Sequence, residues 1–457
     1  MANFSIENFG CRATEADAAA LRRELLASGL TQAEHASADI VVLNTCTVTG
    51  AADSQAREAV RKIHRANPAA RIIVTGCYAQ RAPEELTAID GVTWVVGNSH
   101  QAEIPGLVRG MLAPATPGVM PLAGSPARIL AGDILAQTTV QIAPASLMAD
   151  DRTRPILKVQ DGCNNRCSYC VIPFVRGRSR SLPPEAVVGE VRMLVAAGAK
   201  EIVLSGINLG SYGRDLTPRA ELSSVVRRIL DETGLEMLRF SSIEPQDITE
   251  DFVALVASSN RLAPHFHVPL QSGSDRILRR MHRWYRSEHY AERVSVIRRR
   301  LPSAAVGADV IVGFPGETEE DFRDTREFIE RLSFTYLHVF SFSTRPGTAA
   351  AGLGDAVPPQ VIRERARALR ELARQKSAAF RASQAGNALR ALTLHTGGGD
   401  WTDALTGNYL KLRIAGRHAA NEWCEAFVTR DPEECLEAVV PGETRLIASA
   451  AIGTSAL

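Results

Sequence analysis

Three thiols lie within eight residues of this chain, at Cys163, Cys167 and Cys170. Structural zinc sites close with four ligands, commonly two separated pairs, and no second pair follows this loop. Cubane iron–sulfur clusters are normally held by four thiolates, so three thiolates leave one iron without a protein ligand. Because an open metal position is where a substrate can bind, the spacing predicts a catalytic iron–sulfur centre.

The composition sets outer bounds on the function. A chain of 457 residues has room for about three domains, and 45% hydrophobic residues suit a globular protein. A formal net charge of +1 means that any contact with nucleic acid must come from local patches. Eight cysteines without a recognisable leader, and no apolar run of about 18 residues, favour a cytoplasmic protein with no membrane contact.

The first segment, residues 1–111, alternates strand and helix patterns. A helix is expected over residues 15–28, and strands are expected over residues 4–9, 39–44, 71–75 and 94–97. This order predicts an α/β fold with an open, mostly parallel sheet.

Three further cysteines, Cys11, Cys46 and Cys77, each follow one of these strands. Open α/β sheets bind ligands at the carboxyl ends of their strands, so we expect the three thiols to converge on a second metal centre. The alternative is three buried core cysteines, since free cysteine is among the most buried residue types.

The rest of the chain divides into three parts. Residues 112–150, rich in proline, alanine and glycine, are predicted to be a linker. Residues 151–380 form six β/α units, which predict an open partial barrel whose strand-end loops carry the chemistry. Residues 381–450 alternate like short antiparallel strands and predict a small β-barrel, in which Cys424 and Cys435 are structural. The expected barrel strands are 155–160, 201–205, 237–241, 265–270, 307–312 and 336–342.

The Cys-x3-Cys-x2-Cys loop, with an aromatic residue before its last cysteine, resembles the radical S-adenosylmethionine (SAM) superfamily. The whole chain resembles the methylthiotransferases within it. The segments 44–49, 167–181 and 204–213 are most similar to the tRNA threonylcarbamoyladenosine (t6A) methylthiotransferases. The resemblance implies a terminal RNA-binding barrel of the TRAM type, a t6A substrate beside the anticodon in tRNA, and a monomer.

The resemblance also implies the cofactors: two [4Fe–4S] clusters and SAM. Cys163, Cys167 and Cys170 are then catalytic and hold the cluster that binds SAM, whereas Cys11, Cys46 and Cys77 hold a sulfur-donating cluster. A radical derived from SAM removes the hydrogen from C2 of the adenine, which acid–base catalysis cannot activate. An electron donor such as flavodoxin or ferredoxin and a sulfur source are further implied partners.

Tyr169 stands where the resemblance implies an aromatic residue near the SAM adenine. Five residues that follow barrel strands are further candidates for contacts with SAM or RNA, and each has a simple alternative as a turn residue or strand terminus. They are Gly206, Asn208, Glu244, Gln271 and Ser272.

A basic segment adds an indication of RNA binding. Residues 276–300 hold nine arginines against two glutamates, with Trp284, Tyr285 and Tyr290 among them. Arginine neutralises phosphate and aromatic rings stack on unpaired bases, although such a run is also typical of a solvated helix face.

Two alternatives to the t6A substrate stay open. One keeps the clusters but methylthiolates isopentenyladenosine in tRNA or an aspartate of a ribosomal protein; the Arg-Gly-Arg-Ser-Arg run at 176–180 favours the t6A type. The other is an iron–sulfur protein that binds RNA without catalysis.

Overall fold

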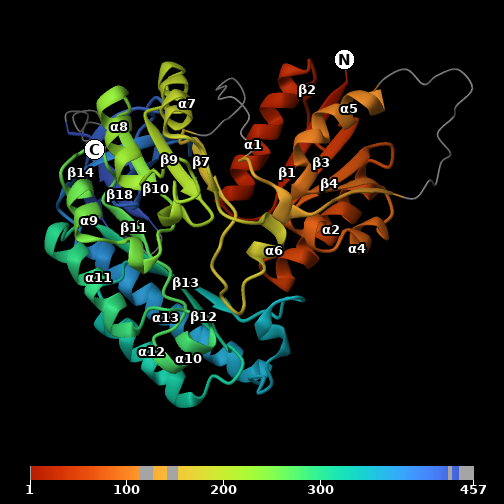
Figure 1. Cartoon of the computed structure of the whole chain (residues 1–457). Coiled ribbons are helices and arrows are strands. Elements are labelled where there is room, and N and C mark those ends of the chain that lie inside the picture. The colour runs from red at the N-terminus through yellow and green to blue at the C-terminus, as the bar shows by residue number, and fades with distance from the viewer. Residues whose placement is uncertain (1, 113–126, 141–152, 431–434, 442–457) are drawn as a thin grey trace, which may run out of the picture.

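The structure, a computed structural model, describes residues 2–112, 127–140, 153–430 and 435–441. The amino-terminal sheet lies beside an open partial barrel, and helix α6 (Ile172–Arg176) sits between them (Figure 1). This confirms the predicted fold class, an α/β protein with a parallel amino-terminal sheet, a partial barrel and a closed carboxy-terminal β-barrel. Among the described residues, no helix has the length and apolar character needed to cross a membrane.

The amino-terminal sheet is parallel and has the strand order β2-β1-β3-β4-β5-β6. Its central strand β3 is buried along its whole length, which explains its continuous apolar run. Its strands are β1 (Asn3–Asn8), β2 (Thr31–Gln32), β3 (Ile40–Thr45), β4 (Arg71–Gly76), β5 (Val92–Gly97) and β6 (Arg128–Leu130). The accompanying helices are α1 (Arg12–Ala27), α2 (Gly50–Ala66), α3 (Cys77–Arg81), α4 (Pro83–Thr87) and α5 (Ile104–Leu112).

Strand β6 lies inside the stretch 112–150 that was predicted to be a linker. It pairs in parallel with β5, so this part of the stretch extends the sheet. A short 3-10 helix, η2 (Ile134–Ala136), follows it. The sequence pattern did not reveal β6, because the stretch is rich in proline and glycine and a strand of three residues is too short to show a period. Residues 113–126 and 141–150 of the predicted linker lie outside the described residues, and the proposed boundaries near 111, 150 and 380 stay predictions.

The partial barrel is built from six parallel strands in two hydrogen-bonded groups, β7-β9-β10 and β11-β12-β13. Bridges such as Ser242↔His267 join the groups. The strands are β7 (Ile156–Asp161), β9 (Glu201–Gly206), β10 (Met237–Phe240), β11 (His265–His267), β12 (Ala305–Val312) and β13 (Tyr336–Ser341), with β8 (Arg180–Ser181) antiparallel to β7. The helices are α7 (Pro184–Ala196), α8 (Leu222–Glu232), α9 (Glu250–Ala257), α10 (Asp275–Arg280), α11 (Ser287–Arg300) and α12 (Glu319–Arg331).

Helix α13 (Pro359–Ala382) leads to a closed five-stranded barrel of order β14-β15-β16-β18-β17. Residues 403–414 fall in two strands, which a turn with Tyr409 at φ 68° separates. This barrel contacts the partial barrel through Arg239, which is buried and donates to the carbonyls of Thr406 and Gly407. The strands are β14 (Ala388–Gly397), β15 (Trp401–Thr406), β16 (Lys411–Ala415), β17 (Trp423–Arg430) and β18 (Leu436–Val439).

Candidate active site

Cys163, Cys167 and Cys170, called the loop triad below, follow strand β7. Gly162 turns the chain with φ 73°, and a Cβ there would lie 2.0 Å from the carbonyl oxygen of Arg178, so glycine is required. The amide of Cys163 donates to Gly177 O (3.1 Å), and the amide of Cys170 donates to Cys167 O (3.1 Å). The three thiols therefore lie on a short loop, and the hydrogen bond to Gly177 O fixes its first cysteine against the chain that follows α6.

Polar groups from distant segments point at the loop triad. Arg283 Nη1 donates to Cys167 Sγ (3.3 Å), and Asn208 Nδ2 lies 3.9 Å from Cys163 Sγ. Arg283 is buried and ion-paired with Glu244. Burial raises the pKa of Cys170 to about 12, so that its thiol is neutral without a metal. N–H donors aimed at sulfur suit thiolate ligands, which accept such bonds in iron–sulfur sites.

Cys11, Cys46 and Cys77, called the strand-end triad below, lie at the carboxyl ends of neighbouring strands. Cys11 precedes α1, Cys46 follows β3, and Cys77 begins α3 directly after β4. The segments are close: a Cβ on Gly10 would lie 2.6 Å from Cys46 Cβ. Burial, together with the nearby Cys77 and Cys11 thiols, raises the pKa of Cys46 to about 12. The structure therefore places the segments that carry these three thiols side by side, and a metal centre there stays a prediction.

One cavity of about 210 Å³ is lined by Cys170 of the loop triad and by residues near Cys46 of the strand-end triad. Val48 and Thr49, just after Cys46, form one wall, and Tyr169 and Cys170 form another. Its remaining lining comes from the strand ends β12 and β13 and from Val171, Ile172 and Gln271. The loop after Cys46 is fixed here because Gly50 N donates to Ser343 Oγ (2.9 Å) and Arg345 pairs with Asp53 (2.6 Å). A molecule in this cavity touches both domains.

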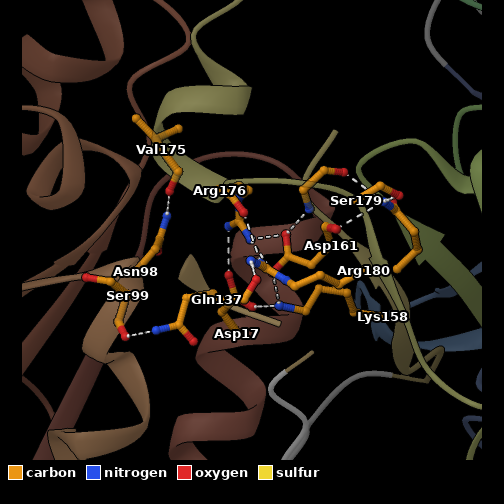
Figure 2. A network of polar contacts seen from close by, with 12 residues as sticks. Asp17, Asn98, Ser99, Gln137, Lys158, Asp161, Val175, Arg176, Ser179 and Arg180 are labelled. Carbon is orange, nitrogen blue, oxygen red and sulfur yellow. Dashed lines mark hydrogen bonds and ion pairs between the residues drawn. The ribbon is translucent and has the colours of Figure 1, made fainter. Parts of the chain in front are cut away.

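A buried group of ionic side chains also joins the two domains, and we call it the interface network: Asp17, Lys158, Asp161, Arg176 and Arg180 (Figure 2). Arg176 donates to Asp17 Oδ2 (2.7 Å) and to Asp161 Oδ1 (3.0 Å). Lys158 contacts the same two carboxylates, 2.9 Å away in the case of Asp161. The sequence pattern did not reveal this network, because Asp17 and Arg176 lie on different domains.

The six residues predicted to contact SAM or RNA differ in their surroundings. Tyr169 packs beside Ile277, Met281 and Phe314 and lines the cavity, as does Gln271, whose φ is 67°. Asn208 is buried near Cys163 with its Oδ1 unpartnered among the described residues.

The other three candidates are occupied by contacts within the protein. Glu244 pairs with Arg283, and the Ser272 hydroxyl contacts Thr325 Oγ1 (3.1 Å). A Cβ on Gly206 would lie 2.9 Å from Gln160 Oε1, so glycine allows that close approach.

The barrel interior holds a group of rings that the sequence did not single out. His267 Nε2 and His338 Nδ1 each lie 3.1 Å from the same oxygen of Asp309. Tyr336 contacts His267 and His265 through its hydroxyl. Because Asp309 also lines the cavity, this polar group borders the candidate active site. Alternating polar residues on β11 and β13 were a sequence sign of it.

The basic segment 276–300 is split by burial. Arg283, Tyr285 and Tyr290 are buried, so the expectation that they form an RNA-facing surface is wrong. Arg283 instead pairs with Glu244, and Tyr285 donates to Leu270 O (2.7 Å). Arg279 is exposed, and Trp284 is 60% exposed. Composition alone could not separate the two sets, because the segment turns between α10 and α11.

The partial barrel and its loop triad define a radical SAM protein: residues 157–329 match the Radical SAM superfamily. Residues 3–97 match the family described as Uncharacterized protein family UPF0004. Threonylcarbamoyladenosine tRNA methylthiotransferase MtaB from Aquifex aeolicus (strain VF5) is 37% identical over 413 residues, which cover 90% of this chain and 96% of that protein. The chain therefore belongs to the methylthiotransferase family of radical SAM enzymes, as the resemblance predicted.

Two further proteins are similar to this chain. The tRNA-2-methylthio-N(6)-dimethylallyladenosine synthase from Thermobifida fusca (strain YX) is 35% identical over 384 residues, which cover 81% of this chain and 73% of that protein. Among solved structures, the radical S-adenosylmethionine methyltransferase TsrM from Kitasatospora setae aligns with a TM-score of 0.55 at 17% identity, covering 77% of each chain. This likeness concerns the fold alone. Membership in the superfamily implies a [4Fe–4S] cluster and SAM.

Proposed function

We propose that the protein is a tRNA methylthiotransferase that converts t6A beside the anticodon to its 2-methylthio derivative. The observation that carries the proposal is the shared cavity, whose walls include Cys170 of the loop triad and the residues directly after Cys46 of the strand-end triad. Methylthiolation needs hydrogen removal and sulfur delivery at one carbon. A substrate base in this cavity would lie between the groups that supply the two steps.

The residues present fit the clusters. All six cysteines are free thiols, and each triad has N–H donors at sulfur, such as Arg283 at Cys167 and Asn98 Nδ2 at Cys77 (3.5 Å). The loop triad would hold the cluster that binds SAM at its open iron, and the strand-end triad would hold a second cluster. A [4Fe–4S] cluster with SAM supplies a carbon radical able to remove an unactivated hydrogen.

The protein's own side chains would position the reactants. Arg283 and Asn208 would hold the loop triad by donating to its sulfurs. Tyr169 and Gln271 line the cavity and would contact SAM or the base. The apolar side chains of Ile311, Phe340 and Phe342 would exclude water from it, which protects a reactive radical from side reactions.

The terminal barrel supports RNA as the substrate. Arg413 lies over the ring of Trp401 (5.4 Å), and Arg390 lies over that of Trp423 (4.3 Å). Trp401 is 39% exposed. Arginine and aromatic faces together contact phosphates and stack on unpaired bases, so this surface would hold the tRNA.

The choice of t6A rests on the relatives. Proteins named threonylcarbamoyladenosine tRNA methylthiotransferase are 33–39% identical to this chain, and proteins named tRNA-2-methylthio-N(6)-dimethylallyladenosine synthase are 33–35% identical. The margin is narrow, so isopentenyladenosine is the second candidate substrate.

Mass spectrometry of tRNA nucleosides from a deletion strain tests the proposal. We expect loss of 2-methylthio-t6A with 2-methylthio-isopentenyladenosine unchanged, and restoration by the intact gene. The reverse pattern would assign the protein to the second substrate, and no change in either nucleoside would contradict a role in tRNA.

A further inference from the structure

The interface network places a buried guanidinium group where the two domains meet. Its three cations, Lys158, Arg176 and Arg180, make all their described ion pairs with two carboxylates, Asp17 and Asp161. A third carboxylate, Asp215, acts electrostatically on Arg180. The side chain of Arg176 is 2% exposed. Burying a charge is costly, so a further anion beside Arg176 would stabilise it.

The network reaches the strand-end triad through Arg176. Cys77 packs with Val171 and Val175 of the segment that ends at Arg176. Asn98 Nδ2 donates both to Cys77 Sγ (3.5 Å) and to Val175 O (2.8 Å), which fixes the two segments side by side. Burial raises the pKa of the Cys77 thiol, and the nearby positive charge of Arg176 opposes this rise. The Nε atom of Arg176 is buried with no hydrogen-bond partner among the described residues.

A bound cluster would place negative charge beside Arg176. A [4Fe–4S]²⁺ core held by three thiolates carries about one net negative charge, and it gains another on reduction. We propose that Arg176 is a positioning residue for the amino-terminal cluster, where the interface network offsets the charge of the cluster and Arg176 donates to its sulfur atoms. This inference rests on the second cluster of the proposed function.

Arg176 also contacts the strand that leads into the loop triad. The same guanidinium group pairs with Asp161, two residues before Cys163 of the loop triad, and with Asp17 of α1. The network therefore links the segments that carry the two triads. Positive charge and N–H donors beside a cluster stabilise its reduced form, so the network should raise the reduction potential of the amino-terminal cluster.

A redox titration of the full chain tests this inference. Cys163→Ala, Cys167→Ala and Cys170→Ala together leave only the amino-terminal cluster, which is followed by electron paramagnetic resonance. In this background Arg176→Gln should lower the midpoint potential so that the ratio of reduced to oxidised cluster falls about tenfold at a fixed potential, or about 59 mV for one electron. Arg176→Lys should restore part of the shift.

Two matched variants separate this role from a merely structural ion pair. Asp17→Asn removes a negative charge from the network and should shift the potential in the opposite direction, upward. Arg178→Gln, an exposed arginine two residues from Arg176, should leave the potential unchanged. A structural role predicts lower melting temperatures for Arg176→Gln and Asp17→Asn but no shifts of opposite sign.

The outcomes are distinguishable. An unchanged potential in Arg176→Gln, or shifts of the same sign in both network variants, would overturn the role of Arg176 and leave the proposed function standing. If Arg176→Gln does not fold, the upward shift in Asp17→Asn decides alone. A parent background that binds no iron would overturn the second cluster itself, and with it this inference.

Discussion

The loop triad comes from one short loop, whereas the strand-end triad is assembled from the ends of β1, β3 and β4. In the loop triad, backbone hydrogen bonds such as Cys163 N to Gly177 O set the spacing of the thiols locally. The strand-end triad depends on strands that pair in register, with Asn8 beside Asn44 and Thr45 beside Gly76. A local loop can form from its own residues, but a strand-end site exists only when the sheet is complete.

The two triads also differ in what surrounds them. The loop triad is supported by Arg283, which comes from the turn after α10, within the same domain. The strand-end triad has Arg176 near it, which lies at the end of α6 in the segment after the loop triad. Cluster binding at the strand-end triad should therefore depend on how the domains fit together.

Removing the loop triad should have the largest effect. We expect Cys163→Ala with Cys167→Ala and Cys170→Ala to abolish formation of 5′-deoxyadenosine and to retain about half the iron of the anaerobically reconstituted parent, because each triad holds one cluster. Iron analysis and chromatography of the reductive SAM cleavage products measure this. If the parent protein contained iron for a single cluster, the two triads would not each hold a cluster.

Removing one ligand of the strand-end triad should give a narrower loss. In Cys46→Ala, SAM cleavage should persist while methylthiolation is lost, since Cys46 lies in the amino-terminal domain. Nucleoside mass spectrometry beside the cleavage assay separates the two activities. Cys424→Ala is a matched control, because Cys424 lies in the terminal barrel near Ala391 O (3.6 Å), and both activities should stay at parent level. Loss of cleavage in Cys46→Ala with the loop cluster intact would refute this division of roles.

Changing the support of the loop triad should lower stability. Arg283→Ala leaves Glu244 with no partner for its buried ion pair, and removing one member of such a pair costs about 3–5 kcal/mol. Arg279→Ala, an exposed neighbour, should change the free energy of unfolding by no more than about 0.5 kcal/mol. Urea unfolding of the metal-free protein compares them. Equal free energies of unfolding for the two variants would show that the Arg283–Glu244 ion pair does not stabilise the turn after α10.

The smallest effect concerns RNA. If exposed Arg279 contacts a phosphate, Arg279→Ala should flatten the log–log salt dependence of tRNA binding by up to about one unit, roughly equally for different tRNA sequences. Arg283→Ala should leave that slope unchanged where the protein is folded, since Arg283 is 3% exposed. Salt-titrated binding measures both slopes, and an unchanged slope in Arg279→Ala would remove this residue from the RNA surface.

Much of the architecture was predictable because it follows from local pattern. Strands β9 and β12 appear within a residue or two of their expected bounds, since apolar periodicity records which face of each element is buried. Strand β6 was missed because three residues show no period.

By itself, the sequence determined the cysteine spacing of the loop triad, the strand-then-cysteine repeat of the amino-terminal domain, and the family. These features need only neighbouring residues, whose geometry the covalent chain fixes. Only the tertiary structure shows that Arg283 is buried and donates to Cys167 Sγ. Only the tertiary structure shows that Arg176 pairs with Asp17, 159 positions earlier in the sequence. The physical reason is that burial and charge pairing depend on which distant segments meet, and a buried arginine carries the same letter as an exposed one.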